Sequence, residues 1–235
     1  MKRLILLFGV LLSVLFVQGC SLDDNSSDGS YQVGGLTMVN GFSGANAVWY
    51  AADGRLIQPP YQGLGYQRYD FVRLYTGNRT LEVLTNKQES LDARVKFQVK
   101  DNQYYTSFVG GGSKVNVIHF VTEDLPLKLA ETQGNGQVGI RFFNLTGEDL
   151  PVQVKLNDQL IFENRNSETA TSAKENQRFI IQSSNTYTVT IEDKDSKSIT
   201  KREQIVLEKG NHYSFILTGS SNAQTPYYLG VVRQF

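Results

Sequence analysis

Short apolar segments separated by polar turns dominate this chain after its first 32 residues. They are rich in β-branched, aromatic and leucine side chains and lie at residues 36–39, 47–50, 81–84 and 115–121. Turn pairs such as Asn40-Gly41 and Asp53-Gly54 stand between them. None is followed by a long pattern with the 3.6-residue period of a helix, which argues against a parallel α/β sheet. The pattern therefore predicts an all-β protein built from antiparallel β-sandwiches.

One pattern occurs twice along the chain. It consists of an apolar segment, a short polar turn and a second segment opened by an aromatic residue, first at residues 97–110 and again at residues 205–217. Apolar segments on both sides of a turn that contains Asn or Gly predict a β-hairpin. We therefore expect one such hairpin in each half of the chain.

The two halves also align with each other. Residues 36–41 correspond to residues 140–145 at an offset of 104, while Leu81 corresponds to Tyr187 at an offset of 106. By the closing segments the offset is 108, a drift that loop insertions would produce. The chain is thus expected to contain the same fold twice.

This repeat predicts two tandem immunoglobulin-like domains of about 100 residues each. The first is expected at residues 33–121 and the second at residues 138–235, with a linker of limited flexibility at residues 122–137.

Residues 1–19 have the order of a secretory signal peptide. A basic start is followed by an uncharged run at residues 4–17, which is shorter than the roughly 20 residues of a membrane-spanning helix. Cys20, the only cysteine, comes next. Residues 17–20 resemble the bacterial lipobox, which implies a lipoprotein with acyl chains such as palmitate on Cys20. The alternative is a lone thiol after a generic signal peptide.

Acylation of Cys20 would make the membrane a partner of the chain, because two or three acyl chains form a lasting anchor at about 0.8 kcal/mol per buried methylene. Residues 20–32 are typical of a flexible acidic tether. Asp23 and Asp24 resemble the export signal of certain Gram-negative lipoproteins, which implies an outer-membrane protein facing the cell exterior. A solvated linker that happens to be acidic is the alternative.

The charge balance argues against nucleic acid as a partner. The chain has 23 basic and 23 acidic side chains, and two of the basic ones, Lys2 and Arg3, lie in the leader. A nearly neutral chain without a basic patch lacks the electrostatic attraction to phosphates on which nucleic-acid binding depends.

Several soft motifs together resemble a known family. They are the strands that end in Asn40 and Asn144, the Val-x-Val strand some ten residues later, a strand of the type Gly-x-Tyr-x-Val, and the closing segment with its tyrosine. These resemble domain of unknown function 4397, although Leu81 and the missing glycine before Tyr187 depart from the pattern. The resemblance implies paired immunoglobulin-like domains in bacterial envelope lipoproteins without an established activity, and it brings no catalytic or ligand residue.

No set of residues with catalytic or metal-binding spacing stands out, so we expect no enzyme, no cofactor and no metal site. His119 alternates with apolar residues and is expected to be satisfied or at a rim, and His212 follows a turn and is expected to be solvated. Residues 192–195 are expected to form a charged hairpin turn, with a cation loop as the alternative. A hydrolase whose carboxylates pair only in space stays open as a third class.

One difference between the halves points toward binding. Residues 58–69 are rich in aromatic residues, Pro and Gly, whereas the matching residues 164–174 are polar. The rings of this loop, with a neighbouring arginine, suit stacking on a sugar or gripping a peptide. These candidate ligand-binding residues are Tyr61, Tyr66, Arg68 and Tyr69. The simpler interpretation, which the sequence favours, folds the rings back as a cap on the sandwich or packs them against the second domain.

Two functions therefore stay open. The first is a non-enzymatic, surface-exposed binding or adhesion lipoprotein with a glycan or protein ligand. The second is a structural component of the envelope that has protein partners only. Exposed rings at residues 61–69 would favour the first function, and rings buried between the domains would favour the second.

Overall fold

The computed structural model describes residues 31–86, 89–124, 135–222 and 224–234. It is almost entirely β-structure, with 63% strands and 4% helix, which confirms the predicted fold class. Contacts group the described residues from Gln32 onward into one compact unit. The predicted signal peptide, Cys20 and the Asp23-Asp24 pair lie outside the described residues.

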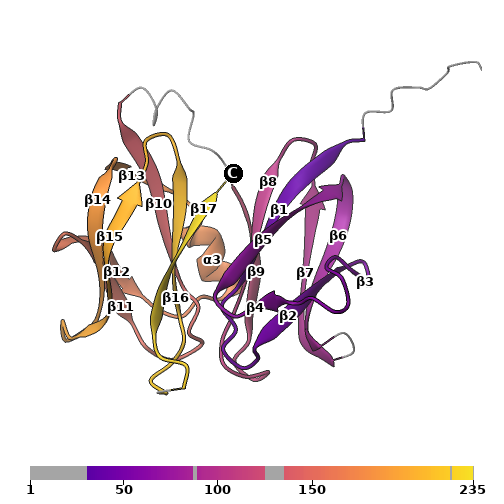
Figure 1. The fold of residues 1–235 in the computed structure, drawn as a ribbon, viewed down its shortest axis with the longest axis horizontal. Coiled ribbons are helices and arrows are strands. Elements are labelled where there is room, and N and C mark those ends of the chain that lie inside the picture. Colours follow the sequence, from indigo (N-terminus) through magenta and orange to yellow (C-terminus); the bar gives the residue numbers. More distant parts are fainter. Residues whose placement is uncertain (1–30, 87–88, 125–134, 223, 235) are drawn as a thin grey trace, which may run out of the picture. The chain divides into compact units, whose positions relative to one another are not determined.

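The first half of the described chain forms two sheets (Figure 1). Its strands are β1 (Val33–Asn40), β2 (Ala47–Ala52), β3 (Arg55–Leu56), β4 (Leu64–Gly65), β5 (Arg68–Tyr75), β6 (Gly77–Asn86), β7 (Glu89–Val99), β8 (Tyr104–Gly110) and β9 (Ile118–Glu123). One sheet has the order β5-β1-β8-β9, and the other has the order β3-β2-β6-β7 with β4 also paired to β2.

The second half repeats this arrangement. Its elements are β10 (Gln137–Asn144), β11 (Val152–Leu156), β12 (Gln159–Arg165), α3 (Ala170–Asn176), β13 (Ile180–Ser183), β14 (Asn185–Asp193), β15 (Ser198–Leu207), β16 (His212–Thr218) and β17 (Tyr228–Gln234). The sheet orders are β13-β10-β16-β17 and β12-β11-β14-β15, which match the two sheets of the first half. The exact limits of the two domains and of the linker at residues 122–137 stay predictions.

Strand pairing is antiparallel, as predicted, except at one place in each half. Strand β1 runs parallel to β8, and β10 runs parallel to β16. The exception falls at equivalent positions, so it is a property of the repeated fold.

The predicted hairpins at residues 97–110 and 205–217 are wrong. Strand β7 pairs with β6, while β8 pairs with β1 and β9, so the turn between β7 and β8 carries the chain from one sheet to the other. The turn between β15 and β16 does the same. Two apolar segments joined by a short turn can lie side by side or face each other across a core, and the hydrophobic pattern does not distinguish these cases.

A tyrosine fixes each of these crossings. The hydroxyl of Tyr105 accepts a hydrogen bond from the amide of Lys100 at 3.1 Å, and that of Tyr213 accepts one from the amide of Glu208 at 3.1 Å. The arrangement is that of the tyrosine corner of immunoglobulin-like domains. This contact explains why both β8 and β16 have an aromatic residue near their start. The sequence shows that this residue is repeated but does not show its role.

The alignment of the halves needs one correction in its middle part. Leu81 pairs with Ala52 across the sheet, and Val189 pairs with Leu156 in the same way. Leu81 therefore corresponds to Val189, at an offset of 108, and not to Tyr187. The offset changes from 104 to 108 between β11 and β14, which places the extra residues of the second half in the stretch that contains α3.

With this correction, Arg79 takes the place of Tyr187. The Arg79 guanidinium donates to the carbonyl of Tyr75 from Nε at 3.1 Å and from Nη2 at 2.9 Å. The Tyr187 hydroxyl donates to the carbonyl of Ser183 at 2.8 Å. Each side chain thus bonds the carbonyl four residues before it, and two chemically different residues perform the same task.

Three apolar cores hold the described chain together. One lies inside each sandwich. The third contains residues of both halves: Val39, Phe108, Ile118, Phe120, Phe143, Leu145, Ala173, Ile216 and Val232. We call this third cluster the shared core. It packs the β5-β1-β8-β9 sheet against the β13-β10-β16-β17 sheet.

Candidate functional site

The aromatic loop does not form a single cluster of rings. Tyr61 is 86% exposed and Tyr69 is 47% exposed, and Arg68, the first residue of β5, is also exposed. Tyr66 is half-buried, and its hydroxyl is buried without a hydrogen-bond partner among the described residues. Tyr66 therefore folds back onto the sandwich as a cap, whereas Tyr61 and Tyr69 present their rings to solvent.

Arg68 and Tyr69 instead line a groove of about 490 Å³ together with residues of the second half. We call it the β5–β17 groove. Its floor is formed by Val39, Ile216 and Val232, and its rim by Gln67, Arg68, Tyr69, Arg202 and Tyr228. Tyr61 and Tyr66 are not part of its lining.

Strand register places the tyrosines at this groove. Tyr69 is the cross-strand partner of Val39, so both side chains lie on the face of the sheet that packs on the second half. On β17, Tyr228 and Val232 lie on one face because their positions alternate along the strand, and Val232 belongs to the shared core. The groove is thus the place where the shared core ends at the strands β5 and β17.

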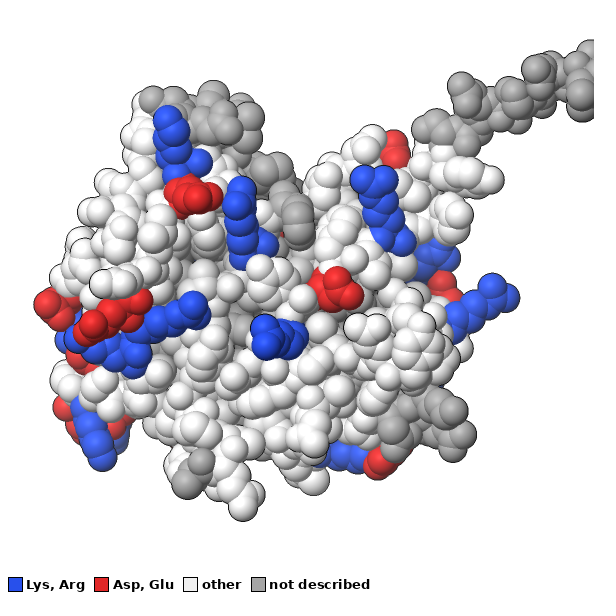
Figure 2. Space-filling model, viewed as in Figure 1, with Lys and Arg blue, Asp and Glu red and all other residues white. Residues whose placement is uncertain are grey.

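The lining of the groove is basic. Arg68 and Arg202 are exposed, and neither forms an ion pair with any residue that the structure describes. The nearby Asp70 accepts a hydrogen bond from the amide of Phe71 at 2.8 Å and is not part of the lining, which contains no carboxylate. On the face shown in Figure 2, both signs of charge are scattered without a large patch of either.

His119 has the structural role that the sequence predicts. Its Nδ1 lies 2.7 Å from the carbonyl of Ala93, so this nitrogen carries the proton, and its Nε2 lies 2.9 Å from the hydroxyl of Ser107 and accepts from it. Burial lowers the pKa of His119 to about 4. The ring is therefore neutral at pH 7, and both of its nitrogens are occupied by structural contacts.

His212 is not solvated, and that expectation is wrong. It is 8% exposed, and its ring meets the ring of Phe179 edge-on at a centroid distance of 5.0 Å. Burial, followed by the positive charge of Arg141, lowers the pKa of His212. The turn that precedes this residue indicated exposure, but the whole of β16 is buried because it lies between β10 and β17 with the shared core on one face.

A buried ion pair connects the halves, and the sequence reasoning missed it. Arg141 Nη2 lies 2.6 Å from Asp124 Oδ1, and both side chains are almost fully buried. Arg141 Nε donates to the hydroxyl of Ser214 at 2.7 Å, and its guanidinium lies 4.5 Å from the centre of the Phe179 ring. An arginine inside the apolar run at residues 138–143 was the available signal, because a buried charge needs a partner.

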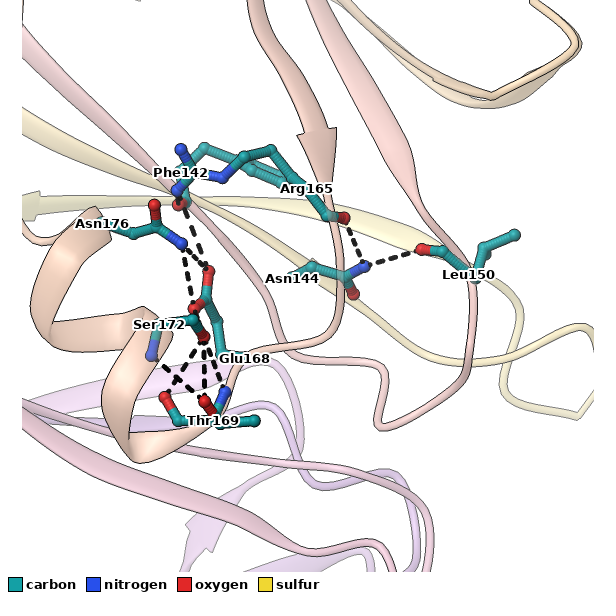
Figure 3. A network of polar contacts seen from close by, with 8 residues as sticks. All are labelled: Phe142, Asn144, Leu150, Arg165, Glu168, Thr169, Ser172 and Asn176. Carbon is teal, nitrogen blue, oxygen red and sulfur yellow. Dashed lines mark hydrogen bonds and ion pairs between the residues drawn. The ribbon is translucent and has the colours of Figure 1, made fainter.

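The polar segment at residues 164–174 includes the first residues of helix α3. Glu168 is 3% exposed and accepts hydrogen bonds from Ser172 at 2.5 Å and from Asn176 at 3.1 Å (Figure 3). Burial raises the pKa of Glu168. Thr169 and Ser172 form a capping box at the start of α3. The network holds the helix in place.

Helix α3 has one buried residue, Ala173, which belongs to the shared core. A second groove of about 470 Å³ lies beside it, where β7, β9 and α3 meet. A helix of seven residues is too short to show a 3.6-residue period, which is why the sequence pattern did not predict it.

The charged residues at 192–195 span the end of β14 and the start of the turn to β15. Asp193 Oδ1 accepts from the amides of Asp195 at 3.0 Å and of Lys197 at 2.9 Å, as an acidic residue at a tight turn does. Among the described residues, no group of three or more His, Cys, Asp or Glu side chains could hold a metal ion. Within the same residues, no helix is long and apolar enough to cross a membrane.

No family model and no curated protein matches the sequence. Solved structures show a distant likeness at 8% identity. A family 26 carbohydrate-binding module of Eubacterium rectale Amy13K, in complex with maltoheptaose, has a TM-score of 0.25 and covers 83% of this chain and 96% of its own. A proposed adhesin of Bacteroides ovatus has a TM-score of 0.20, with 86% and 92% covered. A proposed cell adhesion protein of Bacteroides fragilis has a TM-score of 0.18, with 77% and 69% covered. Likeness at this level carries no argument about what this chain binds.

Proposed function

We propose that this protein is a lipid-anchored, non-enzymatic binding module on the exterior of the outer membrane, and that it holds a glycan or protein ligand in the β5–β17 groove. One observation carries the binding role. Two exposed tyrosines and two arginines without ion-pair partners among the described residues surround an apolar floor. Aromatic and arginine side chains at the rim of an apolar pocket are the residues that dominate binding energies.

The exposure of the rings favours binding over a purely structural role. Tyr69 and Tyr228 are 47% and 36% exposed, although Val39, the cross-strand partner of Tyr69, and Val232, on the strand of Tyr228, are buried in the shared core. Leaving large rings partly in water forgoes burial energy, which a ligand that covers them would supply. Each ring would add about 0.5–1.5 kcal/mol beyond area burial, so one site binds weakly and many copies on a surface bind firmly.

The anchoring part of the proposal rests on the leader. Cys20 follows a signal-peptide pattern, Asp23 and Asp24 follow Cys20, and the repeat resembles a family of envelope lipoproteins. We assign the chain to domain of unknown function 4397 as part of this proposal. The non-enzymatic role is supported by the two histidines, because both are held in structural surroundings.

The binding role is tested with an array of bacterial and host glycans and surface proteins. The full chain, kept in non-ionic detergent, should bind at least one component. Combining Tyr69→Ala with Tyr228→Ala should weaken that binding at least about tenfold, since two ring contacts are lost, and leave the melting temperature nearly unchanged. Tyr61→Ala is the matched control, because Tyr61 is exposed but lies outside the groove. Unaltered binding by the double variant would refute the groove as the site.

A further inference from the structure

The two arginines of the β5–β17 groove come from different sheets. Arg68 is the first residue of β5, and Arg202 lies on β15 and reaches the edge of β17, where its Nη1 is 3.4 Å from the carbonyl of Leu229. Among the described residues this carbonyl is the only hydrogen-bond partner of the Arg202 side chain, and the Arg68 side chain has none. Both guanidinium groups therefore have donors left for a ligand.

Such donors select for anions. The lining has two positive charges and no carboxylate, so binding a neutral ligand would leave both charges without a partner. A guanidinium matches a carboxylate because its parallel N–H groups can donate to both oxygens at once. The protein itself does not supply this carboxylate. Asp70, the nearest acidic residue on β5, does not line the groove.

The remaining lining fits sugar rings. Tyr69 and Tyr228 offer flat apolar faces, and Val39, Ile216 and Val232 form an apolar floor between the polar groups of the rim. A pyranose has apolar C–H faces that pack on such rings, and a uronic acid adds one carboxylate to each ring. We propose that the ligand of this groove is an acidic polysaccharide whose uronate carboxylates are bound by Arg68 and Arg202. This rests on the proposed function, because it names the ligand class of the same groove.

An acidic peptide is the competing anionic ligand, and the structure disfavours it. An extended peptide would add a strand to the free edge of β5 or β17. At β17, Arg202 already donates to the carbonyl of Leu229. At β5, the exposed charges of Arg68, Asp70 and Arg73 are of the kind that protects an edge from added strands. The groove thus offers side chains rather than an open backbone edge.

The test uses polygalacturonate, alginate and hyaluronate as probes, with binding to the full chain in non-ionic detergent measured by calorimetry. At least one should bind, and its fully methyl-esterified form should bind at least about tenfold more weakly, because the charged contacts are lost. Arg68→Gln and Arg202→Gln should each weaken binding about tenfold for the same reason. Arg73→Gln is the matched control, since this exposed arginine of β5 lies outside the groove. Each variant is first shown to keep the melting temperature of the parent protein.

Four results would overturn the inference. Equal affinity for an acidic probe and its methyl ester would mean that charge is not recognised. Tighter binding of poly-glutamate would assign the groove to acidic peptides. An equal loss in Arg73→Gln and Arg68→Gln would mean non-specific attraction. If none of the three probes binds, acidic polysaccharides are excluded as the ligand class. The proposed function would survive all four if the array still gives a ligand that depends on Tyr69 and Tyr228, and it would fail separately if the array does not.

Discussion

Arg141 occupies a position where a charge is costly. Its side chain is 0% exposed and lies beside Phe108 and Phe143 of the shared core, and removing a guanidinium from water costs several kcal/mol unless other groups replace the water. Asp124 supplies the opposite charge at 2.6 Å, and Ser214 and the Phe179 ring cover further parts of the guanidinium. Since Asp124 follows β9 and Arg141 lies on β10, the pair also fixes how the two halves meet.

Removing one partner of the Asp124–Arg141 pair should destabilise the protein far more than removing both partners. Asp124→Ala leaves Arg141 charged and buried without its counterion, which we expect to cost about 3–5 kcal/mol of unfolding free energy. Combining Asp124→Leu with Arg141→Met should restore most of that loss, because no buried charge then stays unpaired. Urea unfolding of the full chain measures the unfolding free energy of both variants.

The exposed pair between Lys201 and Glu203 is the control, since its side chains are 51% and 64% exposed at a separation of 2.7 Å. Lys201→Ala should change the unfolding free energy by less than about 1 kcal/mol. A loss for Asp124→Ala no larger than this would show that the buried pair does not stabilise the junction.

The sequence predicts single residues unevenly. His119 was placed correctly because alternation along a strand indicates which face a residue takes. His212 was misplaced because its strand is buried on both faces, a property that depends on the neighbouring strands and not on local alternation. The partner of Arg141 lies in a different sandwich, so only the three-dimensional structure shows the pair.

At the scale of elements, the crossing turns are the most consistent feature of the fold. Both pass from one sheet to the other within four residues, and both are closed by a tyrosine that bonds an amide five residues earlier. The loop before β8 also pairs with β1, since the amide of Asn102 donates to the carbonyl of Val33 at 2.9 Å. A crossing that is held at both ends positions β8 beside β1, which gives the parallel pair.

Removing either tyrosine hydroxyl should destabilise the fold by a similar amount. We expect Tyr105→Phe and Tyr213→Phe each to cost about 1–2 kcal/mol, because an amide at the crossing loses its acceptor. Differential scanning calorimetry measures the shift in melting temperature. Tyr104→Phe is the control, since Tyr104 is 41% exposed and next to Tyr105. A shift in the control as large as that in Tyr105→Phe would mean that the hydroxyl contact is not the cause.

The strands were predictable and their connections were not. The segments at residues 36–39, 47–50 and 81–84 are strands as predicted, because β-branched and aromatic residues fill a pleated, half-buried surface well. In the segment at residues 115–121, the strand begins only at Ile118. The sheet to which each strand belongs depends on contacts distant in sequence, so the crossings and α3 escaped prediction.

At the scale of the whole molecule, the anchor can be tested apart from the groove. Cys20→Ala should abolish metabolic labelling with a fatty-acid analogue and release the protein from membranes, because the proposed acyl chains on Cys20 hold it there. The double variant with Asp23→Ala and Asp24→Ala is the matched control for acylation and should still be labelled. It should, however, lose its accessibility to external protease if the acidic pair is the export signal. Labelling that persists in Cys20→Ala would exclude the anchor.

The candidate site was predicted in part. The sequence picked out Arg68 and Tyr69 through the aromatic loop, but it grouped them with Tyr61 and Tyr66, which the structure places outside the groove. It did not indicate Arg202 and Tyr228, because these residues approach Tyr69 only through the packing of the two halves. A site that forms where two repeats meet has no local pattern in either repeat.

The shared core has a further consequence, which concerns symmetry. Val39 and Phe143 hold equivalent positions in the two halves, as do Phe108 and Ile216, so each half contributes a patch from the same place in its fold. This is how the subunits of a two-fold dimer meet, and such a contact is complete once two patches are joined. A head-to-tail contact would instead leave a free patch at each end and could grow into a filament. Because both patches belong to one chain, crowding many of these chains on a surface would not polymerise them through this face.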